Sequence, residues 1–272
     1  MMIGKWAPRA WALTAMSASI LALTGQAAAA QRINVLETRP GVTLRLFLET
    51  PAGPAKAVLL MFPGGEGAKR FQEECGKIIL MQDFPGRTTP NFVGKGFAVA
   101  IIDAPSDQAS GMIPGLRNTP EHLQDIRKVV NFLDAQGLSP IYLLGVSNGT
   151  LSVGYAGALL NDERIKGLVL CSTPAERFVS GPLIQRITLP VLMLHHREDG
   201  CPVSPFQEAE RLKSKFTGST KVDFVEVQGG LPPQSGPCNA LSPHGFLGME
   251  DQVVQVITDW VSGNQVPTKV GP

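Results

Sequence analysis

A serine between two glycines is the strongest chemical motif in the sequence. Gly145-Val146-Ser147-Asn148-Gly149 follows an apolar segment at 142–145 and opens a segment, 148–161, with helical composition. A G-x-S-x-G sequence between a strand and a helix places the serine hydroxyl on a strained turn at the end of a sheet. Small flanking residues let the chain pack tightly around such a turn. The motif predicts nucleophilic catalysis by Ser147, and the alternative is an ordinary Gly/Ser/Asn loop.

A serine nucleophile needs a base, and the base needs an acid to orient it. Asp199 follows the apolar segment 190–195, and His244 follows the last predicted strand, 222–227. Serine, acid and histidine therefore occur in the order that this strand–turn–helix motif requires. We expect His244 to accept the serine proton and Asp199 to hold the imidazole in place. Glu198 is the alternative acid.

The other histidines fit the role of the base less well. His122 lies early in a predicted helix that begins at Thr119 and Pro120, and we expect it on the solvated face. His195 and His196 end a strand, so that they should point to opposite sides of it, with one in the core. Neither of them follows the last strand.

Acyl transfer also needs two backbone N–H groups that stabilise the oxyanion. One is expected from Asn148, directly after the nucleophile. The other is expected from the glycine loop 63–67, which follows the apolar segment 57–62; Gly65 is the first choice and Glu66 the alternative. This loop lacks the lysine and hydroxyl residue of a Walker motif and does not match G-x-G-x-x-G, which argues against phosphate binding.

Strands and helices alternate along the chain. Apolar runs predict strands, and residues at helical spacing predict helices between them. The predicted strands are 32–37, 42–49, 57–62, 97–102, 142–145, 165–171, 190–195 and 222–227, and the helices are 119–137, 148–161, 205–216 and 249–261. This order predicts a mostly parallel sheet with helices on both faces. The carboxyl ends of its strands would gather the candidate residues at one edge.

At these motifs the chain resembles the α/β-hydrolase family, and most closely its small exported bacterial members. The resemblance rests on the glycine loop, the serine motif, the loop at Asp199 and the segment His244-Gly245-Phe246. It implies a mostly parallel eight-stranded sheet flanked by helices, with Ser147 as nucleophile, His244 as base and Asp199 as acid. Pro63 stands where the family often has histidine.

Many members of the family carry a cap domain over the site. The stretch between Cys171 and Pro190 is too short for one, so we expect no cap domain. The site should be open or covered only by the loops 104–118 and 229–243, which are rich in Gly, Pro and Ser.

The four cysteines do not have zinc-ligand spacing. If the acid and the base are hydrogen-bonded, the loops that carry Cys201 and Cys238 lie side by side, and a disulfide between them would join these loops. Cys75 and Cys171 are then left as a second pair or as buried thiols. The sequence has no metal or cofactor motif, and we expect neither a metal nor a cofactor.

The N-terminus has the pattern of a signal peptide. Lys5 and Arg9 precede an apolar run, and small residues follow up to Ala30. We expect residues 1–30 to be removed on export to the periplasm or the medium, leaving a single α/β-hydrolase domain at 31–272. The predicted mature chain contains no apolar stretch of the ~20 residues needed to cross a bilayer.

The composition excludes several classes of protein. The net charge of +1 and the lack of a basic run argue against a nucleic-acid partner. With 43% hydrophobic and 17% charged residues, the chain is not disordered. We expect a serine hydrolase that cleaves small-molecule esters or other acyl substrates. The alternatives are a serine peptidase or amidase with the same triad and a non-catalytic binding protein on this fold; the oligomeric state is left open.

Overall fold

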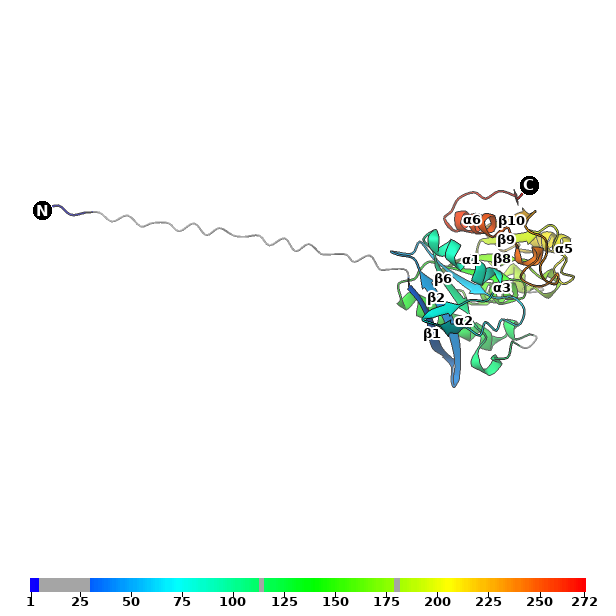
Figure 1. Ribbon diagram of the computed structural model, residues 1–272, viewed down its shortest axis with the longest axis horizontal. Coiled ribbons are helices and arrows are strands. Elements are labelled where there is room, and N and C mark those ends of the chain that lie inside the picture. Colours follow the sequence, from blue (N-terminus) through cyan, green and yellow to red (C-terminus); the bar gives the residue numbers. More distant parts are fainter. Residues whose placement is uncertain (5–29, 113–114, 179–181) are drawn as a thin grey trace.

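A mostly parallel sheet organises the chain. The computed structural model describes residues 1–4, 30–112, 115–178 and 182–272 (Figure 1). Nearly all of the predicted signal segment, residues 5–29, lies outside the described residues. Within the described part, no helix combines the length and the apolar character needed to cross a membrane.

The described residues form a nine-stranded sheet in the order β1-β2-β6-β3-β7-β8-β9-β10-β11. Its strands are β1 (Ala30–Arg39), β2 (Val42–Thr50), β3 (Val58–Phe62), β6 (Ala98–Ile102), β7 (Ile141–Val146), β8 (Ile165–Cys171), β9 (Val191–His196), β10 (Val222–Val227) and β11 (Lys269–Val270). The pairs β1–β2 and β2–β6 are antiparallel, and the other pairs are parallel. The prediction of a mostly parallel sheet is confirmed. The count is nine rather than eight, since the short β11 pairs with the end of β10.

Helices cover both faces of this sheet. On one face lie α1 (Phe84–Gly94) and α6 (Glu250–Val261), which contact each other and appear side by side in Figure 1. The other face carries α2 (Pro120–Ala135), α3 (Gly149–Leu159), α4 (Pro182–Gln185) and α5 (Phe206–Leu212). A small hairpin of β4 (Gln72–Glu74) and β5 (Lys77–Ile79) lies before α1.

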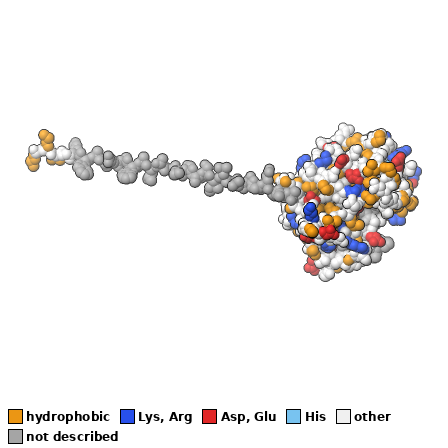
Figure 2. Space-filling view, in the orientation of Figure 1, with side chains coloured by type: hydrophobic (Ala, Val, Ile, Leu, Met, Phe, Trp, Pro, Cys, Tyr) orange, Lys and Arg blue, Asp and Glu red, His pale blue; other side chains and the backbone are white. Residues whose placement is uncertain are grey.

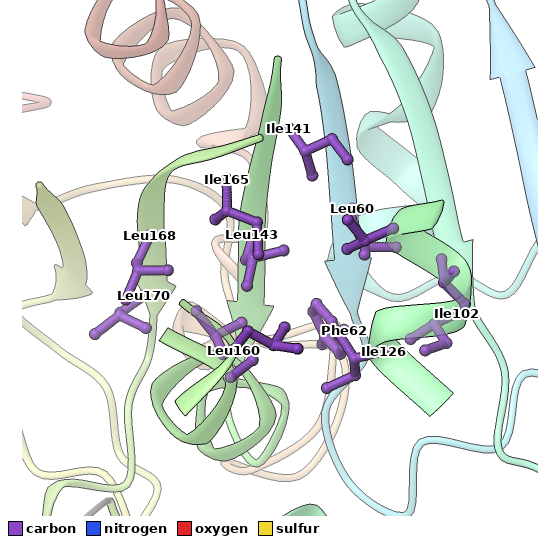
Figure 3. Close-up of a cluster of buried hydrophobic side chains, with 14 of the residues drawn as sticks. Leu60, Phe62, Ile102, Ile126, Ile141, Leu143, Leu160, Ile165, Leu168 and Leu170 are labelled. Atoms are coloured by element: carbon purple, nitrogen blue, oxygen red, sulfur yellow. The ribbon is translucent and has the colours of Figure 1, made fainter. Parts of the chain in front are cut away.

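The core has two layers because the central strands are buried on both sides. In β3, Leu60 and Phe62 pack toward α2 and α3, whereas Leu59 and Met61 pack toward α1 and α6. Figure 3 shows the first layer, in which Ile126 of α2 lies near Phe62. Fully burying a Leu or Phe side chain stabilises the fold by about 1.5–3 kcal/mol. Continuous apolar runs of this kind are typical of parallel strands.

The helix α2 begins where the sequence predicts, but one of its residues does not lie where expected. The Oγ1 atom of Thr119 accepts a hydrogen bond from the His122 amide at 3.3 Å, and Pro120 occupies the first turn. The prediction of a solvated His122 was wrong, because this side chain is only 1% exposed and packs between α2 and α3. Its Nε2 atom lies 2.9 Å from Ser152 Oγ.

Burial of His122 makes the stability of the fold depend on pH. Burial and the nearby Arg117 cation lower the pKa of His122 to about 3. Between this pKa and the ordinary value of ~6.5, the unfolded chain binds a proton that the folded chain does not bind, so stability falls as the pH falls. At pH 5 the loss relative to pH 7 is about 2 kcal/mol.

We expect His122→Gln to reduce this loss, because the amide does not titrate. Urea unfolding of both proteins at pH 7.5 and pH 5 measures it. An unchanged difference between the two pH values in the variant would contradict the assignment to His122.

Candidate active site

The turn that carries Ser147 is strained and held by hydrogen bonds. Ser147 has a φ of 51°, which is uncommon for a residue other than glycine and costs about 1–3 kcal/mol. Its amide donates to the Cys171 carbonyl of β8 at 2.8 Å. Its carbonyl accepts from the Thr150 amide at 2.9 Å and from the Thr150 hydroxyl at 2.7 Å. These contacts hold the turn between β7 and α3 in the geometry that the sequence predicts.

The glycines of the motif allow the close packing that this turn needs. A Cβ atom on Gly149 would lie 1.9 Å from the Phe62 carbonyl oxygen, and one on Gly145 would lie 2.6 Å from the backbone of Thr150. Larger residues at either position would force the helix α3 away from β3 and β7. The turn therefore requires glycine at both positions of the motif.

The structure brings His244 and Asp199 together. His244 lies in a short 3₁₀ helix (Pro243–Gly245) after β10, and Asp199 lies after β9. The His244 Nδ1 atom lies 2.8 Å from Asp199 Oδ2, and the two side chains are 4% and 0% exposed. A carboxylate at this distance favours the proton on Nδ1 and leaves Nε2 as a proton acceptor. The His244 Nε2 atom is buried and has no hydrogen-bond partner among the described residues.

Two residues that the sequence did not single out as partners also hold the acid. Ser204 Oγ lies 3.0 Å from Asp199 Oδ2, and His195 Nε2 lies 3.3 Å from the same oxygen. The Cys201 amide donates to Asp199 Oδ1 at 2.9 Å. Burial opposes ionisation of Asp199, but hydrogen bonds from His195 and His244 outweigh it and hold the pKa of this carboxyl below its usual range. Asp199 is therefore a carboxylate at neutral pH.

Of the weaker sequence candidates, only His195 touches this contact, through Asp199 Oδ2. The alternative acid Glu198 is exposed, and both His195 and His196 are buried, rather than one of them. His196 bonds the Gly229 carbonyl at 3.0 Å through its Nε2 atom.

The glycine loop lies directly against the nucleophile. A Cβ atom on Gly64 would lie 3.1 Å from Ser147 Cβ. The amides of Gly65, Glu66 and Asn148 donate to no acceptor among the described residues. The contacts therefore do not choose between Gly65 and Glu66 as the second predicted donor.

Ser147 and His244 line the same pocket, which has a volume of about 400 Å³. The glycine loop forms one wall, and Phe84 and Pro85 at the start of α1 contribute apolar surface. Of the two loops expected to cover the site, 229–243 contributes 238–240, whereas no described residue of 104–118 lines the pocket. The remaining lining residues are Ala68, Lys69, Arg70, Met81, Asp83, Val146 and Gly245.

The described residues between β8 and β9 form no cap domain. The described residues there form a 3₁₀ turn (Ala175–Arg177) and the short α4.

Figure 2 shows basic and acidic side chains interspersed on the visible face of the folded part. In the part of the chain that the structure describes, no group of three or more His, Cys, Asp or Glu residues could hold a metal ion.

A disulfide joins the loops of the acid and the base. Cys201 and Cys238 are bonded, with their Cα atoms 4.6 Å apart, as the sequence predicts. The other two cysteines do not form a second pair: Cys75 is exposed, and Cys171 is buried at the end of β8, where burial raises the pKa of its thiol.

Removing this disulfide should lower both stability and activity. A bridge that closes a loop of this size stabilises a fold by about 2–4 kcal/mol. We expect Cys201→Ser/Cys238→Ser to lower the melting temperature and kcat together, because the two loops lose their covalent link. Cys75→Ser, which removes an exposed free thiol, is the control. A double variant with the melting temperature and kcat of the wild type would contradict this role.

Comparison with solved structures identifies the fold. No protein-family model matches the chain, and no curated protein matches it in sequence. A PEG-bound cold-adapted esterase from an Arctic intertidal metagenomic library has a TM-score of 0.55 and 20% identity, over 83% of this chain and 93% of that one. An α/β serine hydrolase homologue from Coxiella burnetii has a TM-score of 0.56 and 17% identity, over 83% and 95%.

A third match is an acylaminoacyl peptidase from Pyrococcus horikoshii, with a TM-score of 0.59 and 11% identity, over 90% of this chain and 43% of that one. The mostly parallel sheet, the order of its strands and these similarities define the class. The chain has the α/β-hydrolase fold.

Proposed function

We propose that the protein is a serine hydrolase that cleaves carboxylic esters through an acyl-enzyme. The observation that carries the proposal is the 2.8 Å contact between His244 Nδ1 and Asp199, which leaves the buried His244 Nε2 without a partner. Ser147 lines the same pocket as this imidazole. Nucleophile, base and acid are thus available at one site.

The proposed reaction has two halves. His244 Nε2 accepts the proton of the Ser147 hydroxyl while its oxygen attacks the ester carbonyl carbon. The oxyanion binds the amide of Asn148 and that of Gly65 or Glu66, and collapse of the intermediate releases the alcohol with the proton from His244. A water molecule, deprotonated by His244, then attacks the acyl-enzyme and releases the carboxylic acid and free Ser147.

A second candidate is a peptidase or amidase that uses the same residues. The similarity to the acylaminoacyl peptidase favours this candidate, although it covers less than half of that chain. Amides are harder to cleave than esters because resonance stabilises the C–N bond and an amine is a poorer leaving group than an alcohol. Both activities therefore need to be measured on matched substrates.

We also propose that the protein acts after export, as the basic and apolar pattern of residues 1–30 indicates. The Cys201–Cys238 disulfide supports this proposal, because such bonds persist mainly in oxidising compartments. N-terminal sequencing of the secreted protein tests it, and a chain that starts at Met1 would contradict it.

The activity is tested on the purified mature chain. We expect turnover of p-nitrophenyl esters from acetate to decanoate, slower turnover of the matched p-nitroanilides, and labelling of Ser147 by a fluorophosphonate probe. Faster turnover of the anilides would favour the peptidase. A protein that neither turns over these substrates nor reacts with the probe would be a binding protein on this fold.

A further inference from the structure

Arg117 is a buried cation on the loop side of α3. It lies in a 3₁₀ helix (Leu116–Asn118), and its side chain is 5% exposed. Among the described residues, no aspartate or glutamate forms a salt bridge with it. Burial lowers the pKa of its guanidinium to about 10, so that the group remains charged at neutral pH. Burying an unpaired charge is unfavourable unless hydrogen bonds compensate for it.

The hydrogen bonds of Arg117 go to the glycine loop. Nη2 donates to the Pro63 carbonyl at 3.0 Å and to the Gly65 carbonyl at 3.2 Å. Nη1 donates to the Ser152 hydroxyl of α3 at 3.0 Å. The guanidinium therefore connects the loop that carries the candidate oxyanion donors to the helix that follows the nucleophile.

The loop packs closely on this guanidinium. A Cβ atom on Gly67 would lie 2.7 Å from Arg117 Nη2, and the φ of Gly67 is +74°. Only glycine combines this backbone conformation with such a close approach. The contact is thus built into the loop and is not an accident of a flexible side chain.

The hydrogen bond from Arg117 to the Gly65 carbonyl affects the direction of a neighbouring candidate oxyanion donor, because the two groups belong to one peptide. In a trans peptide the C=O and N–H bonds point in opposite directions, so a fixed Gly65 carbonyl also fixes the direction of the Glu66 N–H. Asn148 Nδ2 donates to the same carbonyl at 3.3 Å, which adds a second restraint. A charged donor on the carbonyl also polarises the peptide and strengthens its N–H as a donor.

We propose that Arg117 is a positioning residue of the oxyanion loop, which orients and polarises its peptides and whose buried charge favours the anionic intermediate. This proposal rests on the proposed function. An ester is neutral and the tetrahedral intermediate is an anion, so a nearby buried cation stabilises the second more than the first. The effect should therefore appear in kcat rather than in KM.

The test compares Arg117→Met and Arg117→Lys with Ser152→Ala in the mature enzyme. We expect Arg117→Met to lower kcat by about 100-fold at nearly constant KM, as the loss of an oxyanion donor does. Arg117→Lys keeps the positive charge but lacks the planar set of guanidinium N–H donors, so its kcat should fall less. Affinity for a trifluoromethyl ketone, which forms an oxyanion on Ser147, should fall in parallel with kcat.

Ser152→Ala is the matched control for a purely structural effect. It removes the hydrogen bond from Arg117 Nη1 and the contact with His122 Nε2, but no contact with the loop. It should therefore lower the melting temperature and leave kcat within about threefold. The proposal is overturned by a folded Arg117→Met enzyme with the kcat of the wild type. It is also overturned if neither Arg117 variant folds, since the residue would then be only structural.

The same experiment separates this proposal from the proposed function. If the wild type hydrolyses esters and reacts with fluorophosphonate at Ser147, and Arg117→Met is equally active, only the proposed role of Arg117 is contradicted. If the wild type neither hydrolyses esters nor reacts with the probe, both proposals are contradicted.

Discussion

Ser147→Ala is expected to abolish ester turnover and to leave the fold intact. The substitution removes the attacking oxygen, and losses of a serine nucleophile are on the order of 10⁴-fold or more in kcat. The Ser147 hydroxyl makes no hydrogen bond with the described residues, and alanine meets the same left-handed backbone as serine. Stability should therefore change little.

Steady-state turnover of p-nitrophenyl butyrate and thermal unfolding measure the two effects. Ser214→Ala is a suitable control, since Ser214 is an exposed serine whose hydroxyl bonds only the Arg211 carbonyl. We expect this control to match the wild type in both measurements. Retained turnover or retained fluorophosphonate labelling in Ser147→Ala would refute the assignment of the nucleophile.

The second large effect is expected from Asp199→Asn. Asp199 Oδ2 accepts from His244 Nδ1, and Asp199 Oδ1 accepts from the Cys201 amide. An amide group that keeps its oxygen on the Cys201 side directs its NH₂ at His244, which then carries its proton on Nε2 and cannot accept the proton of Ser147. In the reversed orientation, the NH₂ group of the amide would face the Cys201 N–H, so that two hydrogen-bond donors would meet. Either orientation impairs the base, and we expect kcat to fall by about 10³–10⁴-fold.

Ser204→Ala is the matched control for this variant. Its hydroxyl lies 3.0 Å from Asp199 Oδ2 and 3.1 Å from His244 Nδ1. Without this hydroxyl the carboxylate still accepts the Nδ1 proton, so we expect a much smaller fall in kcat. Measurements of kcat near pH 7.5 compare both variants with the wild type. If kcat falls by the same small factor in Asp199→Asn and in Ser204→Ala, the Asp199 carboxylate is not the group that orients His244.

Most of the sheet could be predicted from the sequence because its strands are continuous apolar runs between turn residues. The helix α1 could not, since Pro85, Gly86 and Pro90 make its sequence resemble a loop. It forms because Asp83 accepts a hydrogen bond from the Gly86 amide and because its apolar side packs beside α6. The burial of His122 was also missed. Helical spacing shows the apolar side of a helix, but it does not show which other side a neighbouring helix covers.

The candidate site shows the same division. The order of Ser147, Asp199 and His244 along the chain could be recognised because each follows a predicted strand. The roles of Ser204, His195 and Arg117 could not, since they depend on the path of loops that no local pattern describes. The pairing of Cys201 with Cys238 could be inferred only because it follows from contact between the acid and the base.

The disulfide has a consequence for the catalytic cycle. Asp199 lies two residues before one sulfur, and His244 follows the other in the same loop region, so oxidation confines the acid and the base to neighbouring positions. The conformational entropy of their alignment is then lost once, when the sulfurs join, and not again in each turnover. A reduced chain would begin every cycle from a broader set of arrangements, and formation of the disulfide would organise the acid and the base before substrate binds.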